Sequence, residues 1–417
     1  MSAISVIDRD RPAAAYNCVL LLMFVPFLMW SFLGGHKQHF WGVSSDHFFT
    51  MVALAAALII IFSKKCYTPT ELSIFILFFI LIGLFFVSVL RSADPVDSVA
   101  QLVVAVVYIL VSLGIALFFK SKVRLFFNLI ISVSCFSSLT ILVSFLFLGL
   151  GAWGRLTIPV YQDGIFSYFP AGYESSSDPN VLSYFIYIGI LTVFYFKGFS
   201  GWWRLVCFVL FCSALLTMSR SGFVGFSIAV LTYFSIVFIS AVSAGKYSVS
   251  ASSMFFGCFL FWVAGLGLLF FDVGFFYSII LDRINDEGSN ADRIQRIMFS
   301  LDVMLESGSA FFFGHGVGHV RRTVDPHIFY FSTIVDTGFF SLGVMLLLLF
   351  VPVIGIWRRT RCCKARAFVF SLVVFFMTIS LFYWQVRTYY FVLLVLFVLY
   401  FSNSFRVGFR KGRPVIV

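Results

Sequence analysis

The sequence predicts an all-α integral membrane protein with about twelve transmembrane helices. Three observations support this fold class. The chain has 417 residues, of which 61% are hydrophobic and only 11% charged, and its mean hydropathy is +1.03. Uncharged apolar runs of roughly 18 residues or more, each long enough to cross a hydrocarbon core as a helix, recur along the whole length. The ten-residue alternation typical of an outer-membrane barrel does not occur, so helices must satisfy the backbone hydrogen bonds.

Each apolar run defines one expected span. The first run follows the charged residues 8–11, and no small-residue cleavage site comes after it, so we interpret it as a retained helix and not as a signal peptide. We expect residues 1–417 to form one polytopic domain. The spans are expected at residues 15–34, 47–63, 71–90, 98–119, 125–150, 181–196, 203–218, 222–243, 252–271, 337–356, 367–384 and 388–403.

Charge sets the orientation of these spans. Most of the 29 lysines and arginines fall in the connections on the side of the N-terminus, and only Asp8, Asp10 and Glu71 of the 18 acids do so. The positive-inside rule therefore predicts that both termini are cytoplasmic, and it explains the net charge of +11 better than a nucleic-acid partner does. None of the eight cysteines lies in an outer connection, so we expect no disulfide framework.

Two outer segments, residues 151–180 and 272–336, are too long to be simple turns, and loops of this length in a compact bundle usually carry function. In the second, residues 290–305 have the spacing of an amphipathic helix lying along the membrane surface. A structural cap over the bundle or a general attraction to anionic lipid are the alternatives. The apolar side is Ile294, Ile297, Met298, Leu301 and Leu305, and the polar side is Arg293, Gln295, Arg296 and Ser300.

Arg220 lies between two apolar runs, in T-M-S-R-S-G-F-V-G at residues 217–225. A guanidinium near hydrocarbon is unfavourable unless it extends to water or meets an anion. Taken alone, Arg220 fits either situation. Together with the arginines of the large outer segment, it suggests a site for phosphate, because a guanidinium can bind phosphate in a bidentate manner.

All six histidines are expected on the outer side. His327 precedes an apolar run at the edge of the membrane, where an imidazole can serve as a base, although a lone histidine is often structural. His315 and His319 have the spacing of a metal-binding pair, but glycines interrupt any helix there and no third ligand is recognisable, so we expect no metal site. The stretch G-H-G-V-G-H at 314–319 is a weak nucleotide-binding match without a strand before it, so we expect no nucleotide and no other cofactor.

Five motifs in this order resemble the O-antigen ligase and O-antigen polymerase superfamily of bacterial envelope glycosyltransferases. The resemblance covers roughly the central and C-terminal half, from Asp178 onward, and extends to the large outer segment after the ninth span. The motifs are S-S-D-P-N-V-L at 176–182, S-R-S-G-F at 219–223, A-D-R-I-Q-R-I-M at 291–298, F-F-G-H-G-V-G at 312–318, and P-H-I-F-Y-F with D-T-G-F-F-S-L-G across 326–343.

The resemblance implies a GT-C-like, metal-independent inner-membrane enzyme that takes an undecaprenyl-pyrophosphate-linked glycan on the periplasmic face and transfers it to a saccharide acceptor. By similarity, Arg220 and Arg293 bind the pyrophosphate and His327 acts on the acceptor hydroxyl. Family members often carry H-N at this point, whereas Ile328 follows His327 here. Further substrate-binding candidates are Asn180, Arg283, Arg296, His315 and Arg321.

Several functions stay open. A polymerase would add the glycan to another lipid-linked repeat, which we favour slightly, and a ligase would add it to lipid A-core. A chain-length regulator is a possible partner of either. A transporter or flippase is the alternative from another class, although transporters place ionisable groups near the bilayer midplane and this sequence gathers them at one side. A cell-wall polymerase would use an outer carboxylate such as Asp292 or Asp302 as its base.

Overall fold

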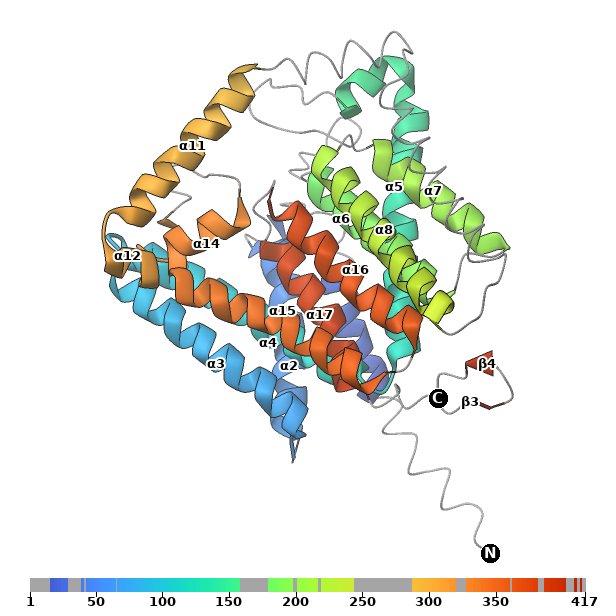
Figure 1. Cartoon of the computed structure of the whole chain (residues 1–417), viewed down its shortest axis with the longest axis horizontal. Helices are drawn as coiled ribbons and strands as arrows, with labels where there is room; N and C mark the ends of the chain where they lie inside the picture. Colours follow the sequence, from blue (N-terminus) through green and yellow to red (C-terminus); the bar gives the residue numbers. More distant parts are fainter. Residues whose placement is uncertain are drawn as a thin grey trace, which may run out of the picture.

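The computed structural model describes residues 16–28, 39–40, 43–64, 66–157, 179–197, 201–216, 219–243, 287–319, 328–360, 362–381, 386–402, 409–410 and 413–414 (Figure 1). Within these residues the regular structure is helical, apart from two antiparallel pairs of two-residue strands. One pair joins β1 (His39–Phe40) to β2 (Val43–Ser44), and the other joins β3 (Phe409–Arg410) to β4 (Arg413–Pro414). The prediction of an all-α fold is confirmed for the described parts of the chain.

The helices follow the expected spans closely. Each expected span coincides with one helix, except residues 252–271, which lie outside the described residues. The helices are Tyr16–Leu28, α2 (Ser45–Ser63), α3 (Pro69–Leu90), α4 (Pro95–Phe119), α5 (Val123–Thr157), α6 (Pro179–Phe196), α7 (Trp202–Leu216), α8 (Arg220–Ser243), α11 (Glu287–Leu305), α12 (Gly308–Phe313), α14 (Phe329–Thr337), α15 (Phe339–Arg359), α16 (Cys363–Ile379) and α17 (Val386–Phe401).

Four helices are long and apolar enough to cross a membrane: α3, α4, α15 and the part of α8 from Ser221 to Ser243. Shorter apolar helices of 10–17 residues accompany them, at Tyr16–Leu28, Phe48–Ser63, Val123–Leu139, Ser183–Phe196, Trp202–Ala214 and Thr388–Phe401. This number of apolar helices in one chain supports a membrane-embedded protein.

Local sequence explains where the helices begin. Thr68 and Glu71 form a reciprocal capping box at the start of α3, with Pro69 in the first turn, and Asp94 caps α4 in front of Pro95. The helix α5 continues to Thr157, so it includes the first part of the expected outer segment 151–180. A short helix, α14, directly precedes the span expected at 337–356. It ends at Thr337, and α15 begins just after Gly338.

The ends of the helices gather at two opposite ends of the bundle. At one end, which we name the basic pole, Lys64 after α2 and Lys120 after α4 form ion pairs with Glu71 of α3. At the other end, which we name the loop pole, the Ser88 hydroxyl of α3 donates to the Asp336 carbonyl, and Arg91 reaches the Gly314 carbonyl. Successive connections between the helices thus alternate between the basic pole and the loop pole, as expected for a chain that crosses a membrane back and forth.

The core of the bundle is aromatic, and glycines allow its helices to approach closely. The helix α8 packs along α16, and a Cβ at Gly225 would lie 2.6 Å from Ile379 Cγ2. Nearby, the ring of Tyr187 in α6 stacks on Phe226 with 4.5 Å between centroids. Small residues at such crossings are typical of helices packed within a membrane, where close van der Waals contact drives association.

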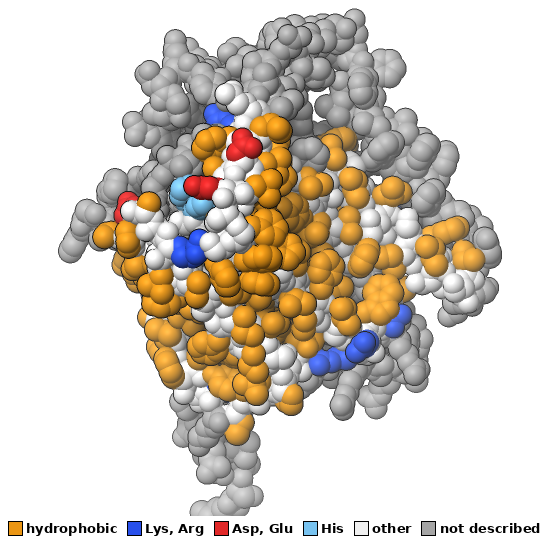
Figure 2. All heavy atoms as spheres, turned by 60° about the vertical axis from the view of Figure 1, so that its left-hand side comes forward, with side chains coloured by type: hydrophobic (Ala, Val, Ile, Leu, Met, Phe, Trp, Pro, Cys, Tyr) orange, Lys and Arg blue, Asp and Glu red, His pale blue; other side chains and the backbone are white. Residues whose placement is uncertain are grey.

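The outer surface has the apolar character that a lipid-facing surface needs. Figure 2 shows hydrophobic side chains over most of one face, with acidic and histidine side chains gathered above them and further basic side chains along the lower edge. Along α3 the exposed apolar residues run almost from end to end: Leu72, Ile76, Phe79, Ile80, Phe86 and Leu90. An exposed apolar field of this extent, bounded by polar side chains, fits a membrane environment.

Candidate functional site

The loop-pole ends of α6 and α8 bring polar side chains together around the position of Arg220. The Tyr184 hydroxyl of α6 lies 2.7 Å from the Ser221 hydroxyl of α8. Ser219 accepts a hydrogen bond from the backbone N–H of Gly222 at 3.2 Å and so caps the start of α8. A Cβ at Gly222 would lie 2.5 Å from Ser183 Oγ, so glycine at this position allows the two helices to meet.

One turn deeper in the same region, Tyr187 carries a buried hydroxyl that has no hydrogen-bond partner among the described residues. The edge of its ring lies beside Gly222, since a Cβ there would be 3.1 Å from Tyr187 Cε2. A buried hydroxyl without a partner is unfavourable by roughly 1–3 kcal/mol, so such groups are uncommon in folded proteins and usually have a reason.

The start of α14 is attached to the end of α16 at the same pole. The backbone N–H of Phe329 donates to the Ser380 carbonyl at 3.1 Å, and the Tyr330 hydroxyl donates to the Met377 carbonyl at 3.1 Å. Burial raises the pKa of Tyr330 to about 12, so its phenol stays protonated and keeps this donor role. The chain therefore enters α14, directly after residues 326–328, against the last turn of α16.

These two regions meet through α16. Ile379, next to Ser380, is the residue that Gly225 of α8 approaches, and Phe375 lies one turn earlier beside the same glycine. The ring of Phe375 also contacts the ring of Tyr184, with 6.0 Å between centroids. The structure thus brings the start of α8, which is Arg220, and the start of α14 to the same end of α16.

The glycines of the motif F-F-G-H-G-V-G form a tight loop after α12. Backbone hydrogen bonds hold this loop against α14. Gly314, Gly316 and Gly318 have φ values of 77°, 121° and 82°, a region that side-chain-bearing residues rarely adopt. The N–H of His315 donates to the Val335 carbonyl at 2.8 Å, and that of Gly316 to the Asp336 carbonyl at 3.1 Å. The loop is thereby fixed to the end of α14.

The side chain of His315 is held by the last turn of α11 and by the residue that follows this helix. Its Nε2 lies 3.0 Å from the Val303 carbonyl and 3.8 Å from the Glu306 carboxylate. Its ring stacks on His319 with 5.1 Å between centroids. Since a carbonyl only accepts, Nε2 carries the proton in the neutral ring, which leaves Nδ1 as the acceptor. Among the described residues, no group of three histidines, cysteines or carboxylates is arranged to hold a metal ion.

The expected amphipathic helix is present as α11, and part of its polar side is buried. Ser300 and Met304 are buried, whereas Met298 and Leu305 are 55% and 72% exposed, and the helix packs against α14 and α12. Of the residues on the predicted polar side, Gln295 is exposed and Ser300 is buried, which is possible because a rotation of about 100° per residue places them at different points around the helix. The half-buried Arg296 lies one turn before Ser300, which accounts for the Ser300 hydrogen bond to the Arg296 carbonyl at 2.8 Å.

The remaining sequence-predicted residues divide into two groups. His327, Arg283 and Arg321 lie outside the described residues. Asn180, Arg220 and Arg293 are placed by their backbones, in the first turn of α6, at the start of α8 and within α11, and their side chains lie outside the described parts. Seven residues separate Arg293 from Ser300, so the helical register puts both positions on one side of α11.

Sequence reasoning missed three residues that the fold brings to this pole: Tyr184, Tyr187 and Arg91. Tyr184 and Tyr187 are part of an apolar run, and nothing in their spacing distinguishes a hydroxyl that faces α8 from one that only fills the core. Arg91 had a clearer signal, because it ends an apolar span in front of S-A-D-P. In the sequence alone, this arginine is one charge among those that indicate the orientation of the spans.

Comparison with family models and with curated proteins gave no match to this chain.

Proposed function

We propose that this chain is an inner-membrane glycosyltransferase of the O-antigen ligase or polymerase type. It takes a glycan linked to undecaprenyl pyrophosphate and transfers it to a saccharide acceptor in the synthesis of a surface polysaccharide. In this proposal about twelve spans form a GT-C-like bundle, the basic pole and both termini face the cytoplasm, and the loop pole faces the periplasm. The positive-inside rule supports this orientation.

One observation carries the proposal: the ends of α6, α8, α14 and α16 meet at one pole, and the sequence supplies a cation and an imidazole there. Arg220 begins α8, and His327 comes two residues before the start of α14. The contact of Gly225 with Ile379 and the hydrogen bond from Phe329 to Ser380 tie both starts to the end of α16. The helix α11, which packs against α14, carries two further arginines one turn apart, at positions 293 and 296.

These residues suit the displacement of a sugar from a diphosphate. The oxygen of the acceptor hydroxyl attacks the anomeric carbon, its proton passes to the imidazole of His327, and the bond from the anomeric carbon to the phosphate oxygen breaks. The leaving pyrophosphate gains negative charge, which the guanidinium groups of Arg220 and Arg293 stabilise without giving up a proton. Direct displacement inverts the configuration at the anomeric carbon.

Deletion of the gene, followed by electrophoresis of envelope glycans, tests this function. Loss of chain elongation with core plus one repeat retained is the expected result for a polymerase, which we favour slightly. Bare core with accumulated lipid-linked polymer would indicate the ligase. Unchanged glycans, or lipid-linked repeats trapped on the cytoplasmic face, would contradict both, and the second outcome would favour a flippase.

A further inference from the structure

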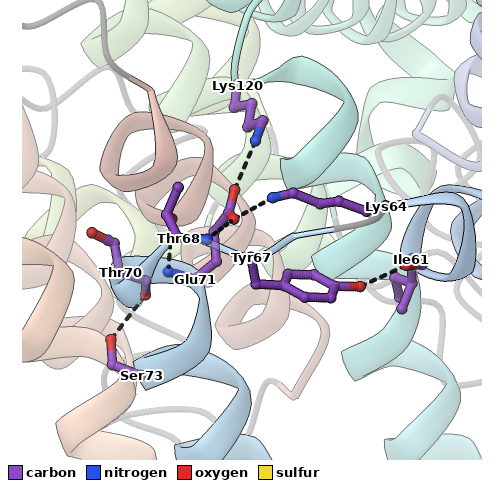
Figure 3. A network of polar contacts seen from close by, with 8 residues as sticks. All are labelled: Ile61, Lys64, Tyr67, Thr68, Thr70, Glu71, Ser73 and Lys120. Carbon is purple, nitrogen blue, oxygen red and sulfur yellow. Dashed lines mark hydrogen bonds and ion pairs between the residues drawn. The ribbon is translucent and has the colours of Figure 1, made fainter.

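We propose that the basic pole carries a binding site for the phosphate of an anionic phospholipid, centred on Lys64 and Lys120. The site lies at the opposite end of the bundle from the glycosyl-transfer site and does not depend on it. The proposal starts from the polar network in Figure 3, which joins the ends of α2, α3 and α4.

A buried carboxylate holds the two lysines side by side. The Glu71 side chain is 1% exposed, while those of Lys64 and Lys120 are 19% and 30% exposed. Lys120 Nζ lies 2.8 Å from Glu71 Oε1, and Lys64 Nζ pairs with Oε2, which also accepts the N–H of Thr68 at 2.8 Å. The Glu71 carboxylate therefore accepts three hydrogen bonds, whereas each ammonium has three donors and gives one of them to the carboxylate.

Positive charge is in excess around this network. Two ammonium groups share one carboxylate, and Glu71 is the only acid at this pole among the described residues. Two more cations nearby bind neutral groups: Lys122 Nζ lies 2.6 Å from Asn17 Oδ1, and Arg359 binds the Thr70 hydroxyl at 2.8 Å and the Tyr400 carbonyl at 3.3 Å. A partly exposed site with unneutralised charge attracts an anion.

The surroundings indicate that the anion belongs to a lipid. The network lies where α2 and α4 end and α3 begins, at the border of the apolar field. Phe62 is 81% exposed and Leu72 is 52% exposed, and both come within two residues of the network in the sequence. Acyl chains can cover such apolar side chains while the phosphate reaches the lysines. Basic clusters at the cytoplasmic end of a membrane helix bind anionic headgroups in this way.

Native mass spectrometry of the full chain in detergent, titrated with phosphatidylglycerol, phosphatidylcholine or inorganic phosphate, tests the site. The chain should retain phosphatidylglycerol in preference to phosphatidylcholine. The Lys64→Gln, Lys120→Gln double variant should lose about 25-fold in affinity for phosphatidylglycerol, because each lysine near the surface contributes about fivefold. A Lys197→Gln, Lys364→Gln double variant removes the same charge from the same pole and should change the affinity less than twofold.

A triple variant, Lys64→Gln, Glu71→Gln and Lys120→Gln, leaves no buried carboxylate without a partner, and it should show the same loss if the double variant fails to fold. Equal losses in the Lys64/Lys120 and Lys197/Lys364 variants would show only a diffuse attraction and would overturn the proposal. Equal retention of phosphatidylcholine, or competition by inorganic phosphate at the same concentration as the lipid, would do so as well.

Discussion

Arg91, at the end of α3, donates from Nε to the carbonyl oxygen of Gly314 at 3.1 Å and from Nη2 to the Ser309 hydroxyl at 3.0 Å. One guanidinium thus joins the end of α3 to the first turn of α12 and to Gly314, which follows α12 and begins the glycine loop that carries His315. The Ser98 hydroxyl of α4 adds a bond to the Val317 carbonyl at 2.9 Å. The turn between α3 and α4 is therefore a support for the loop pole, although it lies more than two hundred residues away in the sequence.

Replacing Arg91 by alanine should loosen the glycine loop. We expect amide protons of residues 308–319 to exchange at least tenfold faster with deuterium, since a charge-assisted hydrogen bond of about 1.5–3 kcal/mol is lost. Ser309→Ala removes only one of the two contacts and should have a smaller effect. Hydrogen exchange in detergent, read by mass spectrometry, measures both. Identical exchange in the wild type and in Arg91→Ala would show that the loop does not depend on this arginine.

Replacing Gly338 by alanine should destabilise the protein. The φ of this residue is 86°, and a Cβ would lie 2.2 Å from the Phe312 carbonyl oxygen, so both the backbone and the neighbouring chain must shift. The expected loss is about 1–3 kcal/mol, seen as a lower melting temperature in detergent. Gly343 is the matched control in the same region, because a Cβ there meets nothing within 4 Å. A Gly343→Ala variant that melts as low as Gly338→Ala would contradict the account.

Packing between α2 and α4 gives a second glycine test, at the centre of the bundle. A Cβ at Gly114 would lie 2.3 Å from Ala57 Cβ, so alanine there should push the two helices apart. Overpacking of this kind destabilises by about 1–3 kcal/mol. Gly83→Ala should be neutral or slightly stabilising, because that position is open and alanine favours a helix. Thermal unfolding followed by circular dichroism compares the pair, and a melting point for Gly114→Ala at or above that of wild type would refute the packing.

Tyr184→Phe should weaken the proposed glycosyl transfer without unfolding the bundle. It removes the contact to the Ser221 hydroxyl at 2.7 Å, next to Arg220, and we expect about a tenfold lower rate of transfer. Tyr233→Phe is the matched control, because its hydroxyl reaches the Phe194 carbonyl at 3.4 Å near the other end of α6. The assay is product formation in membranes with equal amounts of each variant. Equal rates in both variants would remove Tyr184 from the site.

The sequence was sufficient to predict most of the helices, because uncharged runs report directly on burial in lipid. Glycine and proline positions also explain several boundaries, such as Pro69 at the start of α3 and Gly338 between α14 and α15. The faces of α11 could not be predicted in the same way. Its apolar residues Met298 and Leu305 are exposed, whereas Ser300 is buried. A helix in contact with lipid can have apolar residues on its lipid-facing side as well as on its protein-facing side. The polarity of its residues therefore does not show which side is buried in the protein.

From the sequence, the candidate site was predictable only as a set of residue types in the connections that are expected on one side of a membrane. The places of Arg220 and His327 in the chain follow from short motifs, but the way in which the starts of α8 and α14 meet the end of α16 depends on contacts such as that of Gly225 with Ile379. Such long-range contacts leave no pattern in a single sequence. Tyr184 is not recognisable in the sequence for the same reason. Arg91 is visible as the end of an apolar span, but its contact with Gly314 is not.

The most direct test of the central claim is transfer by the purified chain in vesicles, with a donor glycan on undecaprenyl pyrophosphate and a chelator present. We expect the wild-type chain to form product. Arg220→Ala should lower the rate at least a hundredfold while remaining inserted in the vesicles, because a guanidinium that stabilises the leaving pyrophosphate contributes about 3–4 kcal/mol. Arg204→Ala, at the basic pole, should retain the wild-type rate. Product from Arg220→Ala at the wild-type rate would contradict a mechanism in which this guanidinium stabilises the departing diphosphate.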